Sequence, residues 1–359
     1  MPGMMIQLRG VVDELHTAQS KAPNDVADIA GRFGFKTVRV NPFIASAKFL
    51  WMAGRVLSLL MIPIIGLRVP RKSILFVQFP DSYQGKVGLW LLRWIKRHRD
   101  VRMLMLVHDL ATLRYQDQAE LDEKKAIVEE SIGMADALIV HNERMKEWLV
   151  GQGVPARKMV PLVMFDYLTD FVPQIVRGDI DFRSVAIPGY LALSGSGYLA
   201  RLKELAGVTW HLYGVGYDAD KVGADNVRYH GTIAPECLPH ELTAGFGLIW
   251  YGDSMSECNG HLGRYSKYIN PHKFSLFVAT GLPVIVWTKS AMAEFVVANK
   301  IGLAIDSLAD LPRILTAMSK SEYEGYRTNV LELSKKVREG RFTREALTAA
   351  MGILEGDRR

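Results

Sequence analysis

A long polar loop in the second half of the chain holds the densest set of residues that could bind an anionic ligand. It follows the apolar run 247–250 and carries, in order, Asp253, Ser254, Glu257, Asn259, His261, Arg264, Lys267, Tyr268, Asn270, His272 and Lys273. A helix is predicted from its end, with Asn270 as N-cap and Pro271 at the first helical position. The N–H groups of that helix start, together with Lys267 and Lys273, would suit a diphosphate. The competing interpretation is a solvated loop before a capped helix, but long loops in compact domains are usually functional or disordered.

Glycines follow an earlier apolar run, in the stretch IPGYLALSGSGYLARL that contains Gly189, Gly195 and Gly197. Glycine lets backbone N–H groups approach a phosphate, and a following helix start favours negative charge. Loose GxGxxA matches occur at 195–200 and again at 214–219. Two such matches in one chain show how weak the pattern is, and neither has a convincing acidic residue for a ribose. A tight turn explains each glycine about as well as a ligand does.

In the first half, polar residues follow three predicted strands: Gly10, then Asp81, then His108 with Asp109. Asp81, His108 and Asp109 are candidates for a catalytic acid or base. A lone Asp at a strand end is more often a cap or turn residue, so the adjacent pair His108 and Asp109 is preferred. A zinc site is not expected, because Cys258 and His261 have CxxH spacing but, even with His272, no suitably spaced fourth ligand.

Short apolar strands alternate with helices along the chain, which predicts parallel sheets covered by helices on both faces. The chain has 359 residues, enough for two domains. Prolines cluster between residues 151 and 181, so the junction is placed near Asp170. The predicted domains are residues 1–170 and 171–340, each α/β and Rossmann-like, followed by a final helical segment, 341–359.

Net charge and cysteine content indicate which partners and which cellular compartment the protein suits. The net charge is +6, which suits phosphorylated partners without being a nucleic-acid signature. Cys237 and Cys258 are the only cysteines and cannot form a disulfide framework. Together with the lack of a convincing signal peptide, this predicts a cytoplasmic protein.

The apolar run 56–67 is too short to span a bilayer and is interpreted as a buried helix broken at Pro63. Its alternative is an apolar face, flanked by basic residues, that rests on an anionic membrane.

The block from Asn259 to Leu308, NGHLGRYSKYINPHKFSLFVATGLPVIVWTKSAMAEFVVANKIGLAIDSL, resembles bacterial β-1,6-galactofuranosyltransferases and the related streptococcal glucosyltransferase 3. Further matches are TAQSKAPNDVADIA, ILFVQFP, VHDL, ADALIVHNERMKEWL and EGRFTREAL, so the resemblance extends over nearly the whole chain. It implies a GT-B fold, with two Rossmann-like domains facing across a cleft and a final helix that crosses back to the first domain. It also implies self-association.

The resemblance also implies site residues. Those expected to bind a UDP-sugar donor are Gly189, Tyr190, Asp253, Tyr268, Asn270 and Lys273. Those expected on the acceptor side are Gly10, Lys21 and Asp25. Relatives often carry Asn where Tyr190 stands, so this chain departs from the family at that position. No metal is expected, because protein cations and helix dipoles would offset the diphosphate charge.

The predicted reaction is transfer of a hexose from a UDP-sugar to a hydroxyl of a glycan, glycoprotein or lipid-linked acceptor. Galactofuranose is the preferred sugar and glucose the next. His108 or Asp109, with Asp81 as a further candidate, would act as base if the reaction inverts configuration. Two other classes remain open: a non-catalytic sugar-nucleotide-binding partner in a glycosylation complex, and an NAD-dependent dehydrogenase.

Overall fold

The computed structural model describes residues 5–10, 18–40, 61–80, 86–114, 118–173 and 181–356. The chain divides into two compact units. The first comprises Met1–Leu15, Pro23–Leu162 and Thr343–Arg359, and the second His16–Ala22 with Val163–Phe342. Each unit has its own parallel sheet with helices, so the predicted pair of parallel-sheet α/β domains is confirmed.

The sheet of the first unit has the strand order β2-β1-β3-β4-β5-β6, and every pairing is parallel. Its strands are β1 (Met5–Gly10), β2 (Lys36–Val40), β3 (Ile74–Phe79), β4 (Arg102–Val107), β5 (Ala137–Val140) and β6 (Met159–Pro161). Strand order reverses between β1 and β3. In open parallel sheets, ligands bind beyond the carboxyl ends of the strands at such a switch point.

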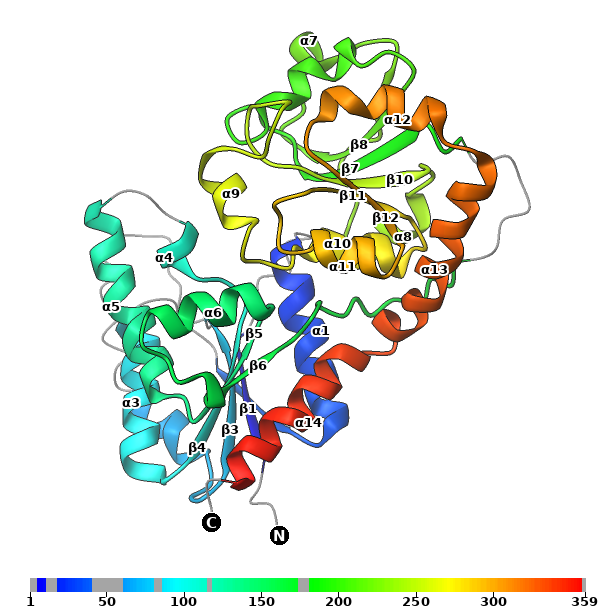
Figure 1. Cartoon of the computed structure of the whole chain (residues 1–359). Helices are drawn as coiled ribbons and strands as arrows, with labels where there is room; N and C mark the ends of the chain where they lie inside the picture. Colours follow the sequence, from blue (N-terminus) through cyan, green and yellow to red (C-terminus); the bar gives the residue numbers. More distant parts are fainter. Residues whose placement is uncertain are drawn as a thin grey trace. The chain divides into compact units, whose positions relative to one another are not determined.

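Helices cover both faces of this sheet, which explains why its central strands are continuous apolar runs. The helices are α1 (Ala18–Phe33), α3 (Lys86–Arg99), α4 (Ala111–Arg114), α5 (Gln118–Met134), α6 (Glu143–Gly151) and α14 (Arg341–Gly356). α3 and α5 lie on one side of the sheet, and α1 and α14 on the other (Figure 1). The side chain of Arg102 on β4 donates a hydrogen bond to the carbonyl of Leu354 near the end of α14. Burial on both faces leaves no place for alternating polar residues.

The sheet of the second unit has the order β12-β11-β10-β7-β8-β9, again all parallel. Its strands are β7 (Ser184–Tyr190), β8 (Thr209–Val215), β9 (Val227–Tyr229), β10 (Phe246–Ile249), β11 (Val284–Trp287) and β12 (Gly302–Ile305). Here the switch point lies between β7 and β10. The predicted phosphate loops follow these two strands, so topology alone brings them to one crevice.

The helices of the second unit differ in kind and length. A 3-10 helix, Gly197–Glu204, replaces the predicted helix after β7. The α-helices are α7 (Ala219–Val222), α8 (Leu238–Glu241), α9 (Gly260–Tyr265), α10 (His272–Ala279), α11 (Ala293–Ala298), α12 (Leu311–Ala317) and α13 (Lys320–Arg338). α10 is buried along most of its length and packs between the sheet and α13 (Figure 1). The polar loop that follows β10 therefore leads into a helix that is largely buried in the core.

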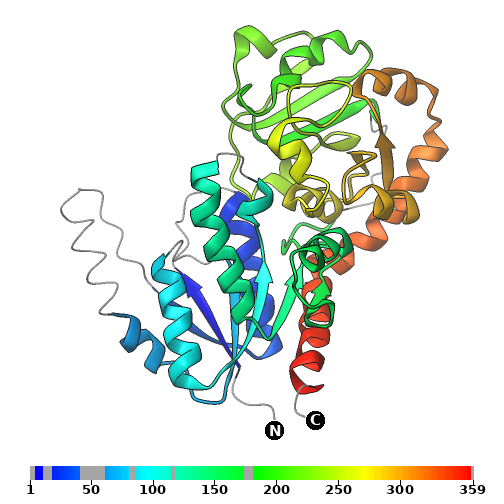
Figure 2. The same ribbon diagram turned by 60° about the vertical axis from the view of Figure 1, so that its left-hand side comes forward.

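The apolar run 56–67 differs from its prediction. Residues 61–67 are helical, and this helix continues through Pro63 instead of breaking there; residues 56–60 lie outside the described part. The helix packs beside α3, where a Cβ on Gly66 would come within 2.3 Å of the Trp94 ring (Figure 2). Ile62 and Ile65 are buried, whereas Ile64 and Leu67 are exposed, so the helix is half-buried. No helix in the described ranges is long and apolar enough to cross a membrane.

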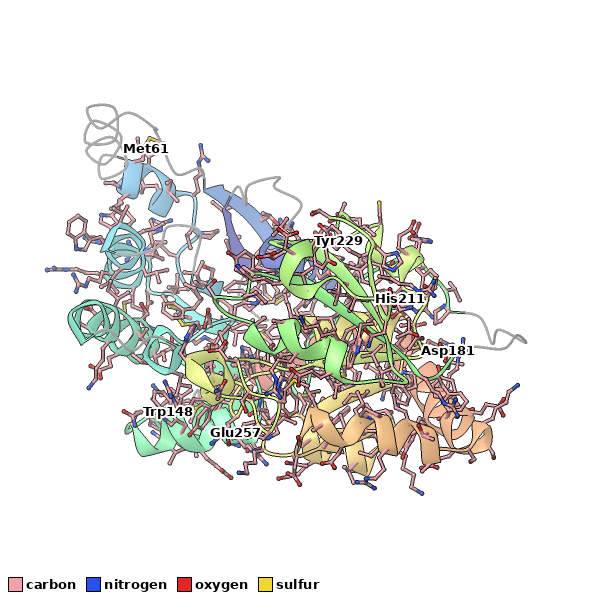
Figure 3. All side chains as sticks on the ribbon, turned by 90° about the horizontal axis from the view of Figure 1, so that it is seen from above. Met61, Trp148, Asp181, His211, Tyr229 and Glu257 are labelled. Carbon is pink, nitrogen blue, oxygen red and sulfur yellow. The ribbon has the colours of Figure 1, made fainter. Side chains whose placement is uncertain are left out.

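The carboxyl ends of β7 and β8 approach each other unusually closely at two glycines. Gly189 pairs with Gly214, and a Cβ on Gly214 would lie 1.8 Å from the carbonyl oxygen of Gly189. Gly214 has φ +137°, a conformation that side chains rarely adopt. The hydroxyl of Tyr229, at the end of neighbouring β9 (Figure 3), donates to the Gly214 carbonyl at 2.8 Å. The loop after β7 is thus built on a backbone contact that only glycine permits.

We predict that Gly214→Ala lowers the free energy of unfolding by about 3 kcal/mol, because the new methyl group clashes with backbone and the positive φ is strained. Urea denaturation followed by circular dichroism measures this. Gly195→Ala is the matched control: nothing lies within 4 Å of its Cβ, and it should change stability by less than about 0.5 kcal/mol. Equal stabilities for the two variants would contradict the close approach.

Candidate functional site

The crevice at the β7/β10 switch point is the candidate ligand site of the second unit. Gly189 and Tyr190 end β7, and Tyr190 is 66% exposed. On the other side of the switch point, β10 ends at Ile249 and leads into the polar loop through Trp250 and Tyr251. The predicted donor residues Gly189 and Tyr190 therefore stand at the same sheet edge as the loop that carries the other four.

Asp253 joins the two loops. Its carboxylate accepts a hydrogen bond from the Gly197 amide at 3.1 Å, and its own amide donates to the side-chain oxygen of Asn259 at 2.7 Å. Glu257, further along this loop, is labelled in Figure 3. Because Asp253 already accepts from the Gly197 amide, the first residue of the 3-10 helix does not present its N–H group to a phosphate. The visible role of Asp253 is to hold the rim of the crevice in shape.

The start of α10 differs from its prediction. The helix begins at His272, and Pro271 occupies the N-cap position with no side-chain cap hydrogen bond. Asn270 is not the cap. It is buried, and its amide donates to the carbonyl of Val163 at 3.0 Å. The predicted pattern was off by one residue, because Pro271 has the extended backbone of an N-cap, with φ −65° and ψ 135°, and the helix begins one residue later. The first N–H groups of α10 consequently lack a side-chain cap, as an anion site requires.

Lys273 is the second residue of α10, and its ammonium group lies at the carboxyl end of β10. Its Nζ is 5.1 Å from the centroid of the Tyr251 ring. Among the described residues, no carboxylate pairs with it. Burial lowers the pKa of Lys273 to about 8. The nearby Cys258 thiol accepts from the Tyr251 amide at 3.3 Å and stays protonated, because burial raises its pKa to about 12. Lys273 is thus a partly desolvated cation with no counter-ion among the residues that the structure describes.

Two more lysines gather at the next strand. The Nζ atoms of Lys267 and Lys289 lie 5.5 and 5.7 Å from the ring of Trp287, the last residue of β11. Tyr268 is half-buried between α9 and α10, and its amide donates to the Tyr265 carbonyl at 2.9 Å. Both ammonium groups are close enough to the Trp287 ring for a cation–π interaction.

A cavity of about 10 Å³ lies between the ends of β10 and β11, with Tyr251, Cys258 and Trp287 in its lining. That volume holds about one water molecule. A nucleotide would therefore bind on the outer crevice and not inside this cavity.

Within the described ranges, no three His, Cys, Asp or Glu side chains come together as a metal site. His272 is neutral because burial lowers its pKa to about 3, and its ring stacks on Tyr167 at 5.0 Å. Both His272 and the protonated Cys258 thus have structural surroundings, and the CxxH spacing of Cys258 and His261 does not build a metal centre.

In the first unit, His108 follows β4 and is oriented by Gln78. The amide nitrogen of Gln78 donates to the Pro23 carbonyl at 3.0 Å, which fixes its oxygen as the acceptor from His108 Nε2 at 2.5 Å. In the neutral form of His108, this hydrogen bond places the ring proton on Nε2. Behind it, buried His141 bonds to the His108 carbonyl at 3.1 Å, and burial lowers the His141 pKa to about 4.

The remaining predicted residues are placed as follows. Asp109 is half-buried beside His108, Gly10 ends β1 at the first switch point, and Asp81 lies outside the described residues. Asp25 is buried in the first unit, whereas Lys21 belongs to the second.

Sequence reasoning missed Gln78, Tyr251 and Trp287. Each stands at or just beyond the carboxyl end of its strand, and this position was the available signal.

Comparison with known proteins assigns both units to one family. Residues 8–164 match the model of the glucosyltransferase 3-like N-terminal domain, and residues 192–350 match that of its C-terminal domain. The chain is 29% identical over 345 residues to the β-1,6-galactofuranosyltransferase WbbI of Escherichia coli K12, covering 93% of this chain and 94% of that protein. It is 23% identical over 262 residues to glucosyltransferase 3 of Streptococcus gordonii, covering 70% and 72%.

Solved structures agree on the fold. The catalytic domain of starch synthase IV from Arabidopsis thaliana, bound to ADP and acarbose, superposes with a TM-score of 0.60 at 10% identity, covering 98% of this chain and all of that one. At this identity the likeness bears on the fold alone. Taken with the two matching domain models and the two parallel α/β sheets, it shows that the chain belongs to the glucosyltransferase 3-like family of GT-B glycosyltransferases.

Proposed function

We propose that this glycosyltransferase moves a hexose from a UDP-sugar to a hydroxyl group of a glycan, glycoprotein or lipid-linked acceptor. The observation that carries the proposal is the ammonium of Lys273, which lies beside the Tyr251 ring beyond the carboxyl end of β10, without a carboxylate partner among the described residues. An unpaired, partly desolvated cation is costly for a protein to maintain unless an anion binds there. The name of the E. coli relative favours galactofuranose as the sugar, and that of the streptococcal relative glucose.

The diphosphate of the donor would lie against the start of α10. Lys273 and the uncapped N–H groups of the helix would stabilise the charge that develops on the leaving UDP, which is the main electrostatic contribution expected in such a site. Gly189, Tyr190, Tyr268 and Asn270 would complete the donor crevice, with Asp253 holding its rim. Protein cations would replace a metal ion, so we propose a metal-independent reaction.

His108 is our candidate for the base, with Asp109 and Asp81 as alternatives. Its Nδ1 would accept the proton of the acceptor hydroxyl as that oxygen forms a bond to the anomeric carbon. The bond from the anomeric carbon to the diphosphate oxygen breaks, and UDP leaves with its electron pair. Gln78 supports this role because its hydrogen bond orients the His108 ring. Gly10 and Asp25 remain our candidates for acceptor binding.

We further propose a cytoplasmic homo-oligomer that touches the inner face of the membrane. Exposed Ile64 and Leu67, with exposed Arg68, Arg71 and Lys72 following them, support a peripheral contact with anionic lipid. A lipid-linked acceptor would be met at such a surface.

The direct experiment is transfer of radiolabelled sugar from UDP-galactofuranose or UDP-glucose to an alkyl glycoside acceptor, with and without EDTA. Product formation that EDTA leaves unchanged supports the proposal. Binding of UDP without transfer to any acceptor would favour a non-catalytic partner, and binding of NAD instead would favour a dehydrogenase.

We predict opposite effects of Lys273→Met on ligand binding and on stability. The folded-state pKa of Lys273, about 8, lies below the usual value for lysine, about 10.4, so its charge destabilises the free protein at pH 7. Methionine removes that cost, and the melting temperature without ligand should rise. A hundredfold excess of UDP over its Kd should stabilise the wild type by about 2.7 kcal/mol but the variant by far less. Lys300→Met, at an exposed position, is the control.

UDP affinity should also depend on pH in a defined direction. Above pH 8 the free protein loses the Lys273 proton, so the affinity should fall by up to about tenfold per pH unit between pH 8 and 9. Isothermal titration calorimetry measures the profile, and Lys273→Met should flatten it. A wild-type affinity that stays constant over this interval contradicts a role for the Lys273 charge in binding UDP.

A further inference from the structure

The first helix of the chain begins in the second unit. Residues 16–22 group with residues 163–342, and the chain passes to the first unit between Ala22 and Pro23, inside α1. Lys21 lies in this initial part and is only 7% exposed. A lysine with this little exposure needs a specific environment, because its charge is costly to bury.

That environment is the segment that begins the second unit. The Lys21 ammonium donates to the Leu168 carbonyl at 2.6 Å and lies 4.7 Å from the centroid of the Tyr167 ring. Tyr167 is buried and is held at its other end as well, since its hydroxyl donates to the Pro235 carbonyl at 2.6 Å. Lys21 and the Pro235 carbonyl therefore hold the Tyr167 side chain from two sides.

Tyr167 in turn contacts the start of α10. The His272 ring stacks on it with centroids 5.0 Å apart and an interplanar angle of 27°. His272 is the first residue of α10 and precedes Lys273. A continuous set of contacts thus runs from Lys21 through Tyr167 to the residue next to the proposed phosphate-binding lysine.

A second contact joins the same two segments. Asn270 donates to the carbonyl of Val163, and Val163 has φ +72°, which is strained for a β-branched residue. Strain of this kind persists only where the surroundings enforce it, and it gathers at functional sites. The segment 163–168 is therefore shaped to support the α10 start at two points, Asn270 and His272.

We propose that Lys21 is a positioning residue of the donor site, acting through Tyr167 and His272 on the α10 start. This rests on the proposed binding of UDP by Lys273 and differs from the acceptor-side role that family resemblance implies for Lys21. Lys21 would not touch the donor. It would set the place of the first turn of α10, and so the direction in which Lys273 and the helix N–H groups point.

The test compares Lys21→Met and Lys21→Arg with the wild type. Arg32→Met, an exposed change on the same helix, is the matched control. Lys21→Met should weaken UDP binding about fivefold and raise the donor KM by a similar factor, with the acceptor KM unchanged. Lys21→Arg should recover most of the affinity, because it keeps both the donor group and the cation over the ring. Lys21→Met and Tyr167→Leu should be non-additive for UDP binding if they act along one path.

Three results would overturn the proposal. One is a UDP Kd that stays within twofold of the wild type while the melting temperature falls, which is a structural role only. Another is a rise confined to the acceptor KM. The third concerns His272, whose pKa of about 3 results from burial first and the Lys21 charge second. NMR titration of His272 should show a higher pKa in Lys21→Met, and an unchanged pKa would refute the contact path. This titration needs no bound UDP, whereas a failure of UDP to bind would count against the proposed function instead.

Discussion

The candidate site of the second unit centres on one buried charge, the ammonium of Lys273. Lys273 is carried into the carboxyl edge of the sheet by a helix that is buried along most of its length, and its ammonium meets an aromatic ring instead of a carboxylate. Desolvation lowers its pKa to about 8, so the protein keeps the cation at a cost in stability near neutral pH. Neighbouring groups do not relieve that cost, because the Cys258 thiol stays protonated. A bound anion would offset this cost.

The topology of the unit places its two polar loops at one edge of the sheet. Reversal of strand order between β7 and β10 opens a crevice at the sheet edge, and a second reversal between β1 and β3 does the same in the first unit. Close contact of Gly189 with Gly214 and the hydrogen bond from Gly197 to Asp253 shape the loops on either side of the β7/β10 crevice. Catalysis by charge stabilisation would need donors that are already oriented, and these contacts hold the two loops in place.

The sequence was sufficient for the architecture. Continuous apolar strands between helices predicted parallel sheets, and strand ends predicted where polar residues would gather. What it did not yield were roles that depend on a distant partner. Asn270 looked like a helix cap, but the Val163 carbonyl, far away in sequence, takes its amide. Lys21 looked like part of the first domain, yet it packs with Tyr167 in the second unit. Pro63 looked like a helix breaker, but the helix over residues 61–67 continues through it.

The account is tested most directly by measuring the protonation of Lys273 itself. The lysine amines can be labelled by reductive ¹³C-methylation and followed by NMR as a function of pH, with Lys273→Arg used to assign the signal. The account predicts a pKa near 8 in the free protein and a marked rise when UDP is bound, because the diphosphate supplies the missing counter-charge. A pKa near the usual lysine value that does not respond to UDP would contradict it.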